Sequence, residues 1–137
     1  RTAEAFGLDG VFMTVGCADR TNPKTVRATM GSIFRLPVWE CPGDEAVRLC
    51  RASGITVCAA ALRPGAKPLT QARLGGAAII IGNEAAGISD ELLGLSDEVL
   101  VIPMRGRAQS LNASAAAAIL IWEMALARGG GDRHGLA

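Results

Sequence analysis

The sequence predicts an α/β protein whose parallel sheet is covered by helices on both faces. Short apolar segments alternate along the chain with segments that carry helix caps and helical spacing of apolar residues. Within each apolar segment, apolar residues follow one another without polar residues between them. This is typical of strands that are buried between two helical layers. This alternation of element types is the pattern of α/β folds with a parallel sheet.

Caps and charges mark the helices in the first half of the chain. The opening segment has the pattern of a helix end closed by Gly7. A second helix begins with Asn22 as N-cap and Pro23 at the first helical position. A third has acidic residues early and Arg48 and Arg51 late, which matches the helix dipole. Helices are therefore predicted over 1–7, 22–31 and 42–54, with extended segments over 10–15, 33–40 and 55–60.

The second half of the chain repeats the alternation after a loop rich in Gly and Pro, residues 62–76. Strands are expected over 77–82 and 98–103. A short helix is expected over 89–96 and a final helix over 111–128. The tail from Gly129 is expected to be flexible.

Composition excludes several function classes. Half of the 137 residues are hydrophobic, which fits one domain with a sizeable core and not a disordered chain. The net charge of +1 does not indicate a nucleic-acid binder, although Arg20, Arg27 and Arg35 would do so if they shared one face. No apolar run is long enough to cross a bilayer, so no membrane association is expected.

Cysteine and histidine usage argues against metal chemistry. None of the four cysteines forms a C-x-x-C pair, and the count is compatible with the reducing cytoplasm. The only histidine, His134, lies in the Gly-rich tail and is expected to be solvated. No carboxylate–histidine cluster offers a metal site, and none is expected.

Polar loops follow three of the predicted strands, where open parallel sheets bind ligands. Gly82 either lets a ligand approach the backbone or makes a simple turn, and Asn83 and Glu84 add an amide and an acceptor. Ser110 and Asn112 are good N-caps, so capping alone is an alternative to a role in a site. No G-x-G-x-x-G or G-K-[ST] motif is present, which disfavours a dinucleotide site or a P-loop. The three loops lie within 58–65, 79–87 and 101–112.

Several segments resemble a known family, the SpoU RNA 2′-O-ribose methyltransferases of the SPOUT superfamily. "IIIGNEAAGIS" and "VIPMRGRAQSLNASAAAAILIWE" are similar to its second and third motifs. "RTAEAFGLDGVFM" is similar to the end of the first motif, and "NPKTVRATMGSIFRLPV" to the stretch that follows it. The resemblance extends to about Arg128.

The resemblance implies a methyltransferase domain over 1–128, truncated at its N-terminus, with a deep C-terminal trefoil knot and a flexible tail over 129–137. It implies S-adenosyl-L-methionine as cofactor, tRNA or rRNA as substrate, and a homodimer. Arg1, Glu84 and Asn112 match the catalytic residues of the motifs. RNA contacts are expected from Arg1, Arg27 and Arg35. Cofactor contacts are expected from Ala60, Gly82, Ile102, Met104, Ser110 and Leu111.

The sequence departs from the family pattern in two places. The first motif has an asparagine upstream of the arginine, whereas this sequence begins at Arg1. The second motif ends in glycine, where Ala85 stands here. Two alternatives stay open: a non-catalytic RNA-binding relative, and a SPOUT enzyme that methylates a base nitrogen. The joint presence of Arg1, Glu84 and Asn112 favours catalysis, and Ser-Leu-Asn favours ribose.

The final helix predicts a dimer independently of the resemblance. It is apolar nearly all round, and Glu123 is the only charge between Asn112 and Arg128. One sheet face covers one side of such a helix, so a second subunit is expected on the other. The alternative is that a neighbouring helix alone covers that side. The apolar positions form two faces: Ala115, Ala118, Ile119, Trp122 and Leu126; and Ala117, Ile121, Met124 and Ala125.

Overall fold

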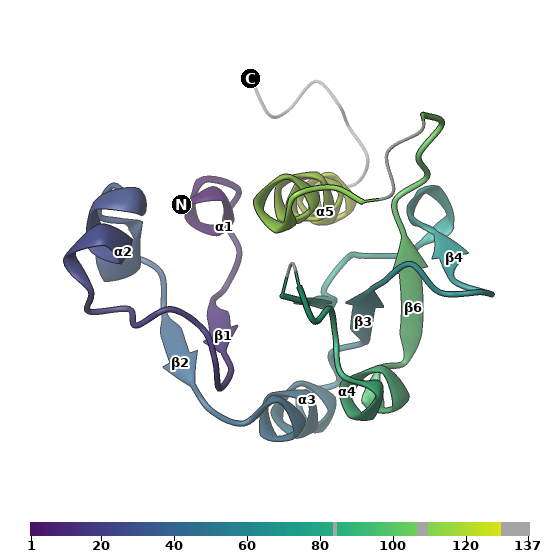
Figure 1. Cartoon of the computed structure of the whole chain (residues 1–137), viewed down its shortest axis with the longest axis horizontal. Helices are drawn as coiled ribbons and strands as arrows, with labels where there is room; N and C mark the ends of the chain where they lie inside the picture. Colours follow the sequence, from purple (N-terminus) through teal and green to yellow (C-terminus); the bar gives the residue numbers. More distant parts are fainter. Residues whose placement is uncertain (84, 107–109, 130–137) are drawn as a thin grey trace.

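The computed structural model describes residues 1–83, 85–106 and 110–129. Glu84 and the tail with His134 therefore lie outside the described residues. Figure 1 shows α1 and α5 on one side of the strands and α3 and α4 on the other. The α-helices of the described residues are α1 (Thr2–Ala5), α2 (Pro23–Ala28), α3 (Gly43–Ala52), α4 (Asp90–Leu95) and α5 (Ala113–Arg128).

Every strand pairing in the described residues is parallel, as the sequence predicts, but the strands form two sheets. One sheet has the order β1-β2 and the other β4-β6-β3-β5. Helices lie on both faces of the four-stranded sheet (Figure 1). The strands are β1 (Val11–Met13), β2 (Val38–Glu40), β3 (Val57–Ala60), β4 (Lys67–Pro68), β5 (Ala78–Ile81) and β6 (Glu98–Val101).

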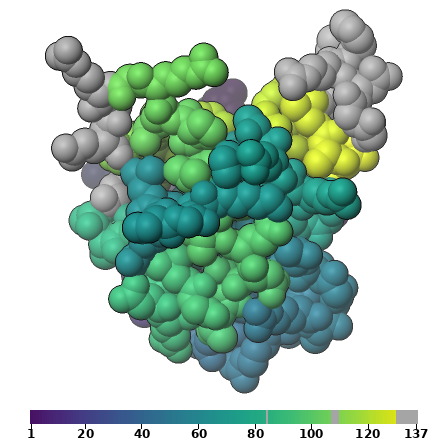
Figure 2. All heavy atoms as spheres, turned by 90° about the vertical axis from the view of Figure 1, so that its right-hand side faces the viewer, coloured from purple at the N-terminus to yellow at the C-terminus, as the bar shows by residue number. Residues whose placement is uncertain are grey.

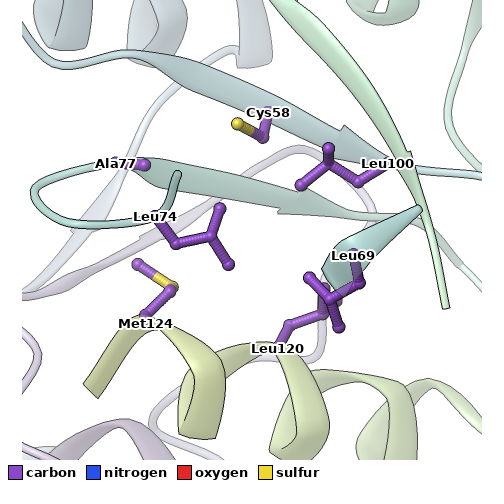
Figure 3. Packing of buried hydrophobic residues seen from close by; sticks show 7 residues of the cluster. All are labelled: Cys58, Leu69, Leu74, Ala77, Leu100, Leu120 and Met124. Carbon is purple, nitrogen blue, oxygen red and sulfur yellow. The ribbon is translucent and has the colours of Figure 1, made fainter. Parts of the chain in front are cut away.

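A separate hydrophobic cluster packs against each face of the four-stranded sheet. On one face, Leu120 and Met124 of α5 point toward Leu69 and Leu74 (Figure 3). On the other, the cluster is built on Val47, Cys50 and Val57, with Phe12, Ile80 and Leu92 among the apolar residues packed against it. Strands that contribute to both clusters must be apolar on both sides, which explains the absence of alternation in the sequence.

The structure corrects the sequence prediction in three segments. The predicted loop 62–76 contains β4 and a 3-10 helix, Leu69–Gln71. The predicted extended segment 33–40 begins within another 3-10 helix, Ser32–Phe34. The second helix ends at Ala28 because Met30 and Gly31 follow with φ of 51° and 81°, a left-handed conformation that helices cannot continue.

The final helix is covered unevenly. Leu120, Met124, Ala125 and Leu126 are buried, while Ile119 stays 37% exposed. The neighbouring helix α1 reaches it through Phe6, whose ring lies edge-on to Trp122 with centroids 5.4 Å apart. No helix in the described part of the chain has the length and apolar character needed to cross a bilayer.

Candidate active site

Strand register brings the three predicted loops to one edge of the sheet. Ala60 at the end of β3 lies opposite Ile81 of β5 and Leu100 of β6. The segments that begin at Ala61 and Gly82 and the segment after Val101 therefore leave the sheet side by side. The face in Figure 2 shows the region around β4 (teal) next to β6 and the residues after it (green).

The loop after β5 is a tight hairpin closed by its own backbone. Asn83 and Gly87 exchange two backbone hydrogen bonds, 3.2 Å and 2.8 Å long. The Asn83 Oδ1 atom also accepts hydrogen bonds from the backbone N–H groups of Ala85 and Ala86, at 2.8 Å and 3.2 Å. Asn83 therefore shapes the loop and does not offer its carbonyl oxygen to a ligand.

Gly82 is required by the loop itself, which is in line with the turn that the sequence offered as one of its two interpretations. A Cβ atom at this position would lie 2.4 Å from the carbonyl carbon of Gly87 and 2.7 Å from the nitrogen of Ile88. The close approach is made by the protein's own backbone. A substitution at Gly82 therefore disturbs the conformation of the loop directly and would affect a bound ligand through that change.

Ala85 stands where the family motif has glycine, and it is exposed. Its backbone N–H donates to the Asn83 Oδ1 atom at 2.8 Å, so alanine at this position takes part in the hydrogen bonding that shapes the loop.

The loop between β6 and α5 ends in a well-defined cap. The Asn112 Oδ1 atom accepts hydrogen bonds from the N–H groups of Ser114 and Ala115, at 2.9 Å and 3.3 Å. This fixes the carboxamide so that its nitrogen, which can only donate, faces away from the helix. Ser110 does not cap α5 and is exposed, and Met104 is half-buried.

Arg1 approaches from a different element. It is the N-cap residue of α1, and its carbonyl accepts the Ala5 N–H at 3.0 Å. At the other end of this segment, Arg128 of α5 donates to the Gly7 carbonyl at 3.0 Å. α1 and α5 thus lie side by side (Figure 1), and the segment that follows α1 is joined to the last turn of α5 through Arg128 and Gly7. Within the described residues, no hydrogen bond or ion pair joins Arg1 to the loops.

The two further arginines expected to bind RNA differ in their surroundings. Arg27 lies in the last turn of α2 and is exposed. Arg35 makes a bidentate contact with Glu4, with distances of 2.9 Å and 3.2 Å to the two carboxylate oxygens. Sequence reasoning missed Glu4, because a lone carboxylate in a short helix has no distinguishing pattern.

The sheet edge has the chemistry that an adenosyl cofactor requires. Leu62, Ile81 and Leu111 are large apolar side chains that stay 56%, 38% and 38% exposed there. These apolar side chains offer a surface on which the ring of a purine can pack. Ala60 and Ile102 pack against the core with Leu100 and Leu120, so a contact from either would be made by its backbone.

A hollow of about 400 Å³ lies elsewhere, at the ends of β1 and β2. It is lined by residues within 13–19 and 40–42 and includes Cys17 and Cys41. All four cysteines are free thiols. Burial, with Glu45 and Asp44 nearby, raises the pKa of Cys41, which therefore stays a thiol at neutral pH.

The sequence profile of the SpoU rRNA Methylase family matches residues 1–122, most of the chain. The chain belongs to the SpoU rRNA methylase family. The matched range includes the loops at the sheet edge, within 58–65, 79–87 and 101–112. Glu84 of the second motif lies outside the described residues, so its position is not described.

Curated SpoU relatives are named as rRNA methyltransferases. The chain is 40% identical over 124 residues to 23S rRNA (guanosine(2553)-2'-O)-methyltransferase RlmP of Bacillus subtilis, covering 90% of this chain and 50% of that protein. It is 33% identical to 23S rRNA (uridine(2479)-2'-O)-methyltransferase of Streptomyces viridochromogenes, covering 90% and 45%. The chain thus spans about half the length of the curated relatives it matches.

Solved methyltransferase structures share the fold. The AdoMet-bound rRNA methyltransferase of Sinorhizobium meliloti aligns with a TM-score of 0.83 at 34% identity, covering 95% of this chain and 49% of that one. The SpoU methyltransferase AviRb of Streptomyces viridochromogenes, in complex with AdoMet, aligns with a TM-score of 0.82 at 33% identity, covering 95% and 54%. The parallel α/β fold is confirmed, and the trefoil knot stays a prediction of the resemblance.

Proposed function

We propose that this chain is the catalytic domain of an enzyme that transfers a methyl group from S-adenosyl-L-methionine to a ribose 2′-hydroxyl of rRNA or tRNA. The observation that carries the proposal is the convergence of the second- and third-motif loops at one sheet edge, beside exposed apolar side chains. The domain spans 1–128, with 129–137 as a tail. The names of the relatives favour rRNA.

In this proposal, Arg1, Asn112 and Glu84 each have a separate role in aligning the acceptor hydroxyl with the cofactor. When bound, S-adenosyl-L-methionine supplies a methyl group already activated by its sulfonium, so the protein must chiefly align the acceptor hydroxyl. Arg1 binds an RNA phosphate and orients the 2′-hydroxyl, because a guanidinium keeps its proton at neutral pH and can only donate. The proton of the hydroxyl leaves to solvent; a route through Arg1 would require the guanidinium to give up one of its own protons first. Asn112 donates from its carboxamide nitrogen, and Glu84 orders the second-motif loop.

Cofactor contacts are assigned to loop backbone and nearby side chains. Gly82, Ile102 and Leu111 line the site in this proposal, with Ala60, Met104 and Ser110 as further contacts. Leu111 is the member of this set that offers exposed apolar surface. Of the three arginines expected to bind RNA, Arg27 is exposed and lies in α2, away from the loops.

Partners and compartment follow from the same features. A second copy of the chain covers the exposed part of α5 around Ile119. The free cysteines favour a cytoplasmic enzyme, because disulfides are rare there. The two rival functions, an inactive RNA-binding relative and a base-nitrogen methyltransferase, remain as outcomes of the test below.

The test is methyl transfer to total RNA by the full-length protein, followed by nucleoside analysis. We expect 2′-O-methylated nucleosides from the parent, and a loss of at least 100-fold in kcat for Arg1→Ala, with cofactor affinity unchanged by calorimetric titration. Asn112→Asp is the matched second variant, because aspartate caps a helix as well as asparagine but lacks the amide donor. It should keep its thermal stability and lose activity.

Three results would contradict the proposal. Methylated bases in place of methylated ribose would favour the base-nitrogen alternative. Cofactor or RNA binding without transfer by the parent would favour the inactive relative. Loss of both cofactor binding and transfer in Arg1→Ala would give Arg1 a structural role.

A further inference from the structure

The position of Arg1 depends on α1, which is too short to hold itself in place. α1 has four residues, and helices of one turn are unstable in water on their own. Arg1 is its N-cap and is tied to it through the Ala5 N–H. Contacts to the rest of the protein must therefore fix both the helix and the arginine.

A polar cluster of Glu4, Ser32 and Arg35 makes one of these contacts, and we call it the Glu4 cluster. The Glu4 Oε2 atom accepts the Ser32 hydroxyl at 3.0 Å and the Arg35 Nη2 at 3.2 Å, and Oε1 accepts the Arg35 Nε at 2.9 Å. Ser32 is 3% exposed and is the only buried polar residue in the described ranges. Two parallel guanidinium–carboxylate bonds fix both distance and direction.

The same cluster also keeps Glu4 from competing for Arg1. Glu4 follows Arg1 by three positions, a spacing at which opposite charges on a helix face one another. The three hydrogen bonds from Arg35 and Ser32 turn the Glu4 carboxylate toward the 3-10 helix. Within the described residues Glu4 makes its ion pair with Arg35 and none with Arg1, whose guanidinium is left for another anion.

We propose that the Glu4 cluster is a positioning device that holds α1 against the 3-10 helix Ser32–Phe34 and leaves Arg1 available to the RNA. This inference rests on the proposed methyl transfer, in which Arg1 orients the acceptor. It gives Arg35 a role different from the RNA contact expected from sequence: Arg35 acts through Glu4. Hydrogen bonding by Arg35 and then by Ser32 lowers the pKa of Glu4, so the cluster is ionised at neutral pH.

Kinetics of the full-length protein separate positioning from RNA binding. We expect Glu4→Gln and Arg35→Met each to lower kcat by about 10- to 100-fold, the range for misplaced catalytic groups. KM for RNA and the affinity for S-adenosyl-L-methionine should stay within twofold of the parent. The double variant Glu4→Gln with Arg35→Met should have a kcat no lower than that of either single variant. The charge swap Glu4→Arg with Arg35→Glu should restore part of kcat.

Matched controls come from an ion pair on the other face of the sheet. Asp44 and Arg48 of α3 are joined at 3.0 Å, and both side chains are more exposed than their counterparts Glu4 and Arg35. Asp44→Asn and Arg48→Met remove the same charges as the test variants and should leave kcat unchanged. If Arg35→Met raises KM for RNA while Glu4→Gln leaves both constants unchanged, Arg35 binds RNA directly and the inference is wrong.

Hydrogen exchange tests the cluster without activity. The Ala5 and Leu8 amides are bonded to the carbonyls of Arg1 and Ala3 at 3.0 Å and 2.9 Å. We expect both amides to exchange at least tenfold faster in Glu4→Gln than in the parent or in Asp44→Asn. Unchanged exchange would overturn the inference. A parent that transfers no methyl group would refute the proposed function, and exchange would still decide the cluster.

Discussion

Gly82 is the residue on which the loop after β5 depends most directly. We predict that Gly82→Ala abolishes measurable cofactor binding and lowers the free energy of unfolding by about 1–3 kcal/mol, the usual cost of overpacking. The added Cβ would lie 2.4 Å from the Gly87 carbonyl carbon, so the hairpin must open. Calorimetric titration and chemical denaturation measure the two effects.

Gly94→Ala is the control for this prediction. It adds the same methyl group to α4 at a position where no atom outside the backbone of that helix and the two neighbouring residues lies within 4 Å. It should leave cofactor binding unchanged and stabilise the protein by about 0.5–1 kcal/mol, because alanine favours the helix. Normal binding and stability in Gly82→Ala would show that the loop tolerates a side chain.

Single residues show where sequence reasoning is sufficient and where it is not. The Asn112 cap followed from residue type and position alone, and the structure confirms it. The Gly82 contact could not be derived, because it depends on how the chain folds back at Gly87 and Ile88. The Arg35 contact joins residues 31 positions apart, a separation at which no local pattern links them.

At the scale of elements, Asp97 connects α3, β3 and β6. Its Oδ2 accepts the Val57 N–H of β3 at 2.8 Å, and its Oδ1 accepts Arg51 of α3 at 2.7 Å. We predict that Asp97→Asn lowers the free energy of unfolding at pH 7 by about 1 kcal/mol. This lies below the range for bonds to charged groups because the carboxylate is 35% exposed.

The pH dependence gives this prediction its sign. The Val57 N–H, and then Arg51, lower the pKa of Asp97 in the folded state. Its contribution is therefore present above the unfolded pKa of about 3.9 and is lost as the pH falls through the lower folded pKa. Urea unfolding from pH 7 to pH 3 should show the parent approaching the variant only below about pH 4. A difference that stays constant to pH 3 would contradict the assignment.

Elements with strong local signals could be predicted, and short elements could not. α3 and α5 have caps, charges and length, and both match their predicted positions within a few residues. β4 has two residues, one of them proline, and is a strand only because Lys67 and Pro68 lie beside Leu100 and Val101 of β6. Local sequence patterns do not show which strand will lie beside a segment, so β4 could not be predicted from them.

At the scale of the whole molecule, one part of α5 stays open. The sheet covers Leu120 and Met124, and α1 covers Trp122 through Phe6. Ile119 keeps 37% of its surface exposed. The alternative to a dimer was that a neighbouring helix alone covers this side of α5. In this chain α1 leaves Ile119 partly exposed.

We predict that the chain forms a homodimer through this open part of α5, with a mass by light scattering of about twice the 14.1 kDa of one chain at micromolar concentration. Ile119→Glu should give monomers, because a charge would be buried without a partner at the contact. Leu49→Glu is the control: Leu49 is 48% exposed on α3, on the other face of the sheet, and its change should leave the dimer intact. A parent mass near 14.1 kDa would refute the dimer, and a dimer that persists in Ile119→Glu would place the contact on another surface.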